Sequence, residues 1–261
     1  MPEKFEHQKQ DDQVEVEKFD LKKPLIVSDM NYERYDPEGE YKLFEFEDDP
    51  NHIVRVEDLD MMRSYLSDEN LTIQEAAEKT KAIFDELRNK FGIDAPVNFA
   101  TAVDETGTQL LYIITDRVQG QKVEEIDFDP LENGKLAEEF ENFYLSLVKY
   151  FVDKFNSNEL VLWDIAKSSA LKYGKKPGDN EDNIYLVDTD VKSEPGEYGI
   201  GDLYDIFPTV RELESKCGRR FDKVRKELKG FIDSFSKSNM KTGALKYIDE
   251  NIGRLVSFLE K

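Results

Sequence analysis

Two short apolar segments that end in carboxylates carry the strongest chemical signal in this sequence. Leu160–Trp163 is followed by Asp164, and Ile184–Val187 is followed by Asp188 and then by Asp190. An aspartate at the mouth of a strand can position a hydroxyl group and accept its proton. Because extended residues i and i+2 face the same side, Asp188 and Asp190 are a candidate pair of magnesium ligands.

Each of these acids also has an ordinary structural explanation. Asp164 precedes Ile165-Ala166-Lys167, where it is equally suited to cap a helical turn. Asp188 is suited to an Asx turn that closes the preceding strand. From the residues alone, both interpretations of each aspartate stay open.

Two earlier segments suggest contacts with phosphate. Gly39–Phe44 is a turn that feeds a strand, and its glycine allows the backbone to approach a ligand closely. Ile53–Val56 contains a single cation, Arg55, in an otherwise apolar strand. The ordinary alternatives are a plain hairpin for the first segment and, for Arg55, a side chain that extends to solvent at a sheet edge.

The strands that must position these residues fall mainly in the first half of the chain. Turns are expected at Asp36–Gly39, Asp48–Asn51 and Asp104–Gly107, which are rich in Asp, Pro and Gly. From the apolar and aromatic runs between turns, strands are predicted at Tyr41–Glu47, His52–Val56, Val97–Val103, Gln109–Thr115, Leu160–Trp163 and Ile184–Val187.

Helices dominate the second half. The segment Thr72–Phe91 has apolar residues three and four apart, and Thr72 with Glu75 forms a capping-box pattern at its start. Glu138–Phe155 has the same period, and residues 201–261 are predicted to be mostly helical, with breaks near Cys217-Gly218 and Lys241–Gly243. Strands early and helices late predict an α+β chain of two unequal lobes that meet near residue 118.

The composition excludes several classes of protein. The 261 residues include 57 acidic and 36 basic side chains, and the net charge of -21 disfavours binding to nucleic acid or to anionic membranes. Cys217 is the single cysteine, so no internal disulfide is possible, and with only His7 and His52 a zinc site is not expected. The apolar runs are far shorter than the roughly 20 residues that span a bilayer, and Met1–Asp12 lacks an export signal. We therefore expect a cytoplasmic protein.

The order of these features resembles the protein kinase-like fold, over roughly residues 35 to 200. In that family a glycine-rich loop covers the nucleotide phosphates, a strand lysine pairs with a helix glutamate, and two later aspartates serve catalysis and magnesium binding. The resemblance implies ATP and Mg²⁺ as ligands. It also implies a lobe of small antiparallel sheet plus one helix over 24–117, and a mostly helical lobe over 118–261. Residues 1–23 are rich in charge, and we expect them to form a mobile arm.

The resemblance assigns nucleotide-binding roles to residues of the first lobe. Gly39–Phe44 corresponds to the glycine-rich loop, with Phe44 over the adenine ring. Arg55 stands where the nucleotide-pairing lysine would be, and Glu75, or alternatively Glu78, would be its helical partner.

The hinge and the catalytic groups follow in the second part of the match. The Asp116 carbonyl and the Val118 amide would face adenine. Asp164 corresponds to the catalytic aspartate, Asp188 to the magnesium aspartate, and Asp190 is a possible second metal ligand.

Several residues depart from the family pattern. Arginine replaces the lysine, Leu162-Trp163 replaces the histidine-arginine pair, and Ser169 stands in place of the metal-binding asparagine. Asp188-Thr189-Asp190 replaces the aspartate-phenylalanine-glycine triplet. The first hypothesis is therefore an atypical ATP-dependent phosphotransferase with an unknown hydroxyl acceptor. The alternatives are a pseudokinase that acts through nucleotide or protein partners, and an acidic interaction protein whose aspartates are coincidental.

Overall fold

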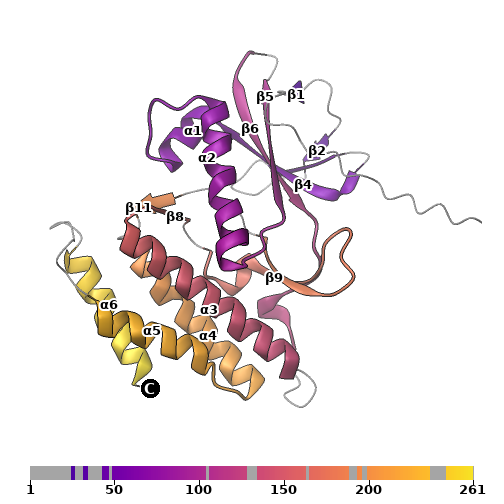
Figure 1. Ribbon diagram of the computed structural model, residues 1–261. Helices are drawn as coiled ribbons and strands as arrows, with labels where there is room; N and C mark the ends of the chain where they lie inside the picture. Colours follow the sequence, from indigo (N-terminus) through magenta and orange to yellow (C-terminus); the bar gives the residue numbers. More distant parts are fainter. Residues whose placement is uncertain are drawn as a thin grey trace, which may run out of the picture.

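The computed structural model describes residues 25–26, 32–34, 43–46, 49–103, 106–127, 134–162, 165–187, 193–195, 199–235 and 245–260. It is an α+β structure in which the main sheet and α2 lie at one end, and α3 to α6 lie at the other (Figure 1). The helices are α1 (Leu59–Tyr65), α2 (Ile73–Glu86), α3 (Gly134–Ser157), α4 (Ile200–Cys217), α5 (Asp222–Ser234) and α6 (Leu245–Leu259).

The main sheet has six strands in the order β1-β5-β6-β4-β3-β2. The pairing of β1 with β5 is parallel, and the other pairings are antiparallel. The strands are β1 (Leu25–Ile26), β2 (Tyr32–Arg34), β3 (Leu43–Phe46), β4 (Asp49–Asp58), β5 (Val97–Val103) and β6 (Gln109–Asp116). The expected strand at Val97–Val103 is confirmed with the same bounds, whereas β4 extends beyond the predicted His52–Val56.

Two smaller antiparallel sheets follow the main sheet in the chain. One has the order β10-β9-β7, and the other pairs β11 with β8. The strands are β7 (Gln119–Lys122), β8 (Leu160–Leu162), β9 (Leu171–Lys175), β10 (Asn183–Leu186) and β11 (Ser193–Pro195). Gly120 on β7 is the register partner of Gly174 on β9, and a Cβ on either would lie 2.1 Å from a backbone oxygen of the other strand. Only glycine allows β7 and β9 to approach this closely.

Helix α2 covers one face of the main sheet. Thr72 Oγ1 accepts from the Glu75 N–H at 3.3 Å, and the Glu75 carboxylate accepts from the Thr72 N–H at 2.8 Å, so the predicted capping box is confirmed. The buried side of the helix packs on β5, where the rings of Phe84 and Phe99 lie 5.7 Å apart. The helix continues as a π-helical turn at Leu87–Phe91, which ends at the expected residue.

Helix α3 forms the centre of the helical end and packs against α4 and α5. It includes the predicted Glu138–Phe155 and is longer at both ends. Its buried Lys154 pairs with Glu86 at the end of α2 at 2.5 Å and with Glu159 at 2.8 Å. The pair with Glu86 joins α2 to α3, and therefore joins the sheet-rich end to the helical end.

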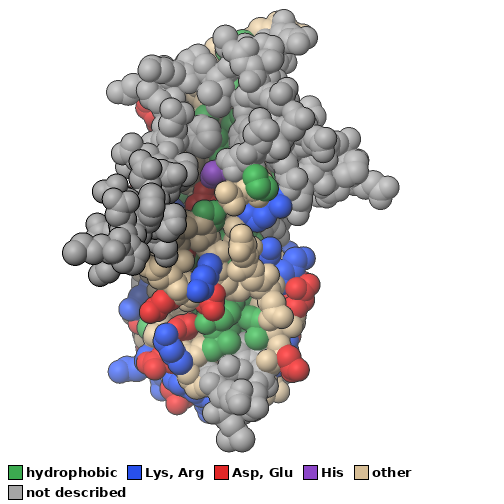
Figure 2. Space-filling view, turned by 90° about the vertical axis from the view of Figure 1, so that its right-hand side faces the viewer, with side chains coloured by type: hydrophobic (Ala, Val, Ile, Leu, Met, Phe, Trp, Pro, Cys, Tyr) green, Lys and Arg blue, Asp and Glu red, His purple; other side chains and the backbone are tan. Residues whose placement is uncertain are grey.

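The remaining helices agree with the predicted C-terminal region. Helix α4 ends at Gly218, which has a left-handed backbone (φ 60°), so the break expected near Cys217 is confirmed. The other expected break, at Lys241–Gly243, and the proposed arm over residues 1–23 lie outside the described residues. On the face of the molecule in Figure 2, acidic and basic side chains are interspersed over the helical end. Within the described ranges, none of the helices combines the length and apolar character needed to cross a bilayer.

Candidate functional site

The described residues next to the three candidate aspartates are each held by a neighbouring element. Leu162, at the end of β8, is the register partner of Ser193 on β11. The Val187 N–H, just after β10, donates to the Ala170 carbonyl at 2.9 Å. Asp164, Asp188 and Asp190 themselves lie outside the described residues. Both β8 and β10, which carry the described ends of these segments, contact α3.

A buried tyrosine holds the end of β8. The Tyr150 hydroxyl, on α3, accepts a hydrogen bond from the Leu162 N–H at 2.9 Å. Burial raises the pKa of this hydroxyl above its ordinary value, the hydrogen bond from Leu162 partly offsets this, and the charges of Glu86 and Asp202 raise the pKa further. Asp202 is 5% exposed in the first turn of α4. Both residues were missed from the sequence, although an aspartate in the apolar start of a helix was a usable signal.

Replacing Tyr150 with phenylalanine tests this anchor. The Leu162 N–H would lose its partner in a buried site, so we expect the free energy of unfolding to fall by about 1–3 kcal/mol in urea titrations. Tyr144→Phe is the matched control, since Tyr144 is equally buried on α3 and its hydroxyl has no hydrogen-bond partner among the described residues. Equal losses in the two variants would contradict the assigned role of the Tyr150 hydroxyl.

Arg55 lies buried in the middle of the main sheet. It is 7% exposed on β4, an interior strand between β3 and β6. This placement excludes the alternative of an arginine that reaches solvent at a sheet edge. Its Nε lies 3.1 Å from Oε1 of Glu57, which is 5% exposed and follows two residues later on the same strand. Because a buried ion pair is weak evidence for stability, this pair is not explained by stability alone.

The two candidate helix partners of Arg55 make other contacts in this structure. Glu75 is exposed and its carboxylate accepts two hydrogen bonds from Thr72, which lower its pKa. A carboxylate that completes a capping box is not free to reach across to the sheet. Glu78 is also exposed and accepts from the Gln74 side chain. Glu57 is the acidic residue that the described structure pairs with Arg55.

The predicted hinge is a short extended connection between β6 and β7. The Asp116 N–H donates to the Pro96 carbonyl at 2.8 Å, and the Arg117 N–H donates to the Asn51 carbonyl at 2.6 Å. Val118 is 3% exposed, and its carbonyl accepts from the Lys172 ammonium at 3.4 Å. In the described part of the chain, no acceptor takes the Val118 N–H.

The side chain of Asp116 belongs to a different surface from Arg55. Asp116 pairs in register with His52, whereas Arg55 pairs with Ile113, and alternation along the strands places these two pairs on opposite faces of the sheet. The Asp116 carboxylate lies 3.3 Å from Nε2 of His52. Asp116 is thus suited to contribute its backbone, and not its carboxylate, to a site near Arg55.

Of the other predicted site residues, some lie within the described residues and some do not. Gly39 lies in the connection between β2 and β3, which is outside the described residues. Phe44 lies on β3 in register with Val54, so Leu43, and not Phe44, is the strand partner of Arg55. Ser169 lies in a short 3₁₀ turn between β8 and β9. Among the described residues, no three His, Cys, Asp or Glu side chains form a metal site.

Comparison with known proteins gives no match to a family model and no match to a curated protein. The function is therefore inferred from the residues and their geometry.

Proposed function

We propose that the chain has a two-lobed protein kinase-like fold and is an ATP-dependent phosphotransferase. The succession of described elements supports the fold. The β2–β3 hairpin is followed by β4 with its buried cation, by α2, by the β5–β6 pair, and by a short extended connection. Helix α3, β8 and the β9–β10 hairpin then lead to the second candidate acid, in the order that the resemblance implies.

The observation that carries the proposal is that the described residues next to the aspartates are held by neighbouring elements. Asp164 is two residues from Leu162, Asp190 is three residues from Ser193, and Leu162 pairs with Ser193. Asp188 directly follows Val187, which is hydrogen-bonded to Ala170. The proposal assigns all three carboxylates to one shared site.

Two features fit the two ends of a nucleotide. They are the connection between β6 and β7, and the buried Arg55 of β4. The Val118 N–H has no acceptor among the described residues and suits a ring nitrogen of adenine. Arg55 offers a positive charge in a site of low solvent access, where attraction to phosphate is strong. Its ion pair with Glu57 would fix the direction of the guanidinium group.

The chain's own groups then have distinct tasks. Asp188 and Asp190 would hold magnesium, which neutralises charge on the transferred phosphoryl group. Asp164 would orient the hydroxyl of the acceptor and accept its proton. Arg55 would steady the phosphates, and Tyr150 would hold the strand that leads to Asp164. The acceptor class stays open among hydroxyl compounds.

A pseudokinase is the second candidate, and a specific observation favours it. Arg55 is already neutralised by Glu57, while Glu75 is used in the helix cap. A cation held in this way attracts phosphate less than an unpaired one. With Ser169 in place of the metal-binding asparagine, the chain would then bind nucleotide weakly and act through a partner.

Thermal and chemical unfolding with Mg-ATP separates these functions. With ligand at a hundredfold to a thousandfold excess over its dissociation constant, we expect stabilisation by roughly 3–4 kcal/mol. Arg55→Gln should reduce this gain, because it removes the charge that faces the phosphates. Arg63→Gln is the control, since Arg63 lies on α1 and pairs with the exposed Asp60. No stabilisation of the unmodified chain at millimolar Mg-ATP would contradict nucleotide binding.

A further inference from the structure

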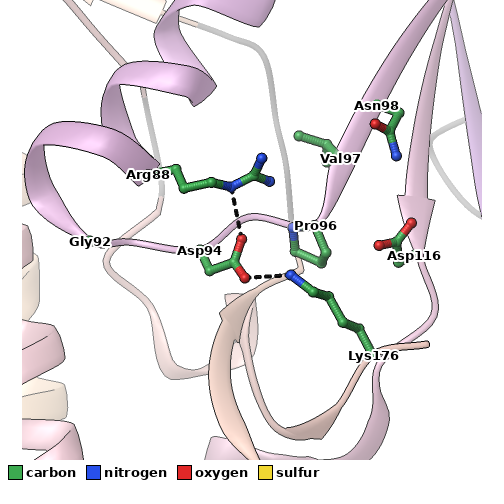
Figure 3. Close-up of a pocket in the computed structure, with 8 residues that line it drawn as sticks. All are labelled: Arg88, Gly92, Asp94, Pro96, Val97, Asn98, Asp116 and Lys176. Carbon is green, nitrogen blue, oxygen red and sulfur yellow. Dashed lines mark hydrogen bonds and ion pairs between the residues drawn. The ribbon is translucent and has the colours of Figure 1, made fainter. Parts of the chain in front are cut away.

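A second candidate site lies at the end of the main sheet where β5 begins and β6 ends. A cavity of about 470 Å³ opens there, between this edge of the sheet, the turn after the π-helical segment, and the start of the β9–β10 connection. Its size is within the usual range for small-ligand sites. Figure 3 shows the residues that line it, which include Arg88, Asp94, Pro96, Asn98, Asp116 and Lys176.

One side of the cavity carries an excess of positive charge. The Arg88 Nε donates to Asp94 at 3.1 Å, and the Lys176 ammonium donates to the other oxygen of Asp94 at 2.6 Å (Figure 3). The Arg88 Nη2 also donates to the Ala95 carbonyl at 2.7 Å. Two cations thus share one carboxylate. The Arg88 Nη1 and the remaining protons of Lys176 have no acceptor among the described residues, so this side can bind a carboxylate.

The opposite side offers acceptors. Asp116 uses one carboxylate oxygen toward His52, at 3.3 Å, and its second oxygen has no partner among the described residues. The Asn98 amide lies beside Asp116 and makes no hydrogen bond to a described group (Figure 3). Asp116 is only 20% exposed in its side chain, so its negative charge is partly removed from solvent. A primary ammonium group would satisfy both side chains.

The cavity as a whole selects against ligands with a single sign of charge. Arg88 and Lys176 balance Asp94 and Asp116 in formal charge. A phosphate would meet two carboxylates, and a metal cation would meet an arginine and a lysine. We infer that this cavity binds a small zwitterion, an amino acid whose carboxylate faces Arg88 and Lys176 and whose ammonium faces Asp116 and Asn98. The inference uses the Asp116 side chain, whereas the proposed nucleotide site uses its backbone, so the two proposals can fail separately.

Calorimetric titration of the full chain tests this inference. The probes are glycine, β-alanine and γ-aminobutyrate, which differ in the distance between their charges, together with butyrate and butylamine, which each carry one charge. We expect one amino acid to bind with a dissociation constant of about 1 mM or tighter, and each singly charged analogue to bind about tenfold or more weakly.

Two variants and a control locate the binding. Lys176→Met and Asp116→Asn should each weaken binding of the tightest-binding amino acid by about tenfold. The reason is that each variant removes one charge-assisted hydrogen bond. Lys175→Met should leave its affinity unchanged, because Lys175 is exposed and its ammonium donates to the Asn180 carbonyl. Three results overturn the inference: no binding by any of the three amino acids, equal affinity for butyrate or butylamine, or unchanged affinity in both cavity variants.

Discussion

Magnesium-dependent ATP turnover is expected to fall by roughly a hundredfold or more in the Asp188→Ala chain, the range typical for loss of one preorganised electrostatic group at a reaction centre. The reason is that Asp188 is the proposed magnesium ligand next to the anchored Val187. Without it, charge on the transferred phosphoryl group would lose its main compensation. Release of phosphate or ADP over a range of magnesium concentrations provides the measurement.

The controls for this prediction come from the same part of the chain. Asp182→Ala removes an exposed acid just before β10 and should leave turnover unchanged. Asp190→Asn should raise the magnesium concentration needed for half-maximal turnover, because Asp190 is the proposed second ligand. Turnover equal to that of the unmodified chain in Asp188→Ala would refute the assignment. Nucleotide binding without turnover in the unmodified chain would favour the pseudokinase.

The largest expected loss of stability is for Arg225→Met, at about 3–5 kcal/mol, as for other buried ion pairs that lose one partner. The Arg225 guanidinium donates to both carboxylate oxygens of Glu214, at 3.1 and 2.7 Å, and lies 4.4 Å from the centre of the Phe258 ring. It therefore joins α4, α5 and α6. The measurement is the free energy of unfolding in urea near pH 7. Arg220→Met is the control, because Arg220 is 58% exposed and pairs with a surface aspartate.

The same ion pair predicts a dependence of stability on pH. Burial raises the pKa of the Glu214 carboxyl, but hydrogen bonds from Arg225 and from the Phe221 N–H outweigh burial and hold it below the ordinary 4.5. Since the pKa is lower in the folded chain than in the unfolded one, this contribution is complete above about pH 4.5 and is lost as the pH falls further. In Arg225→Met this acid-side loss should be smaller. An identical profile in both chains would contradict the role of the pair.

The elements with strong local signals could be predicted from the sequence. Thr72 and Glu75 fix the start of α2 by a reciprocal cap, and the structure begins the helix at Ile73. Strand β5 agrees with the predicted Val97–Val103, because turn residues bound an apolar run on both sides. In these places local preference and tertiary packing favour the same structure.

Other elements depend on tertiary contacts that the sequence pattern does not contain. Strand β7 is exposed at every position, Gln119–Lys122, and has no apolar period. It forms because β9 supplies its hydrogen-bonding partner and because Gly120 and Gly174 allow close approach. Helix α1 follows β4 without a break, and only the Asp58 cap, which accepts from the Met61 N–H, marks its start.

Only part of the candidate site could be predicted from the sequence. The sequence distinguishes the single cation of β4, whereas the resemblance places its acidic partner on the helix. Strand period alone puts Glu57 on the same side as Arg55, and the structure pairs them. Tyr150 could not be distinguished by pattern from the other aromatic residues of α3, because its hydrogen bond to Leu162 depends on the packing of α3 against β8.

The most direct test of the central claim is a crystal structure of the full chain with magnesium and a non-hydrolysable ATP analogue. We predict adenine against the Val118 N–H, the phosphates within reach of Arg55, and the metal bound by Asp188 with Asp164 facing the terminal phosphoryl group. A nucleotide bound elsewhere, or Asp164 and Asp188 on separate surfaces, would contradict the proposed phosphotransferase site.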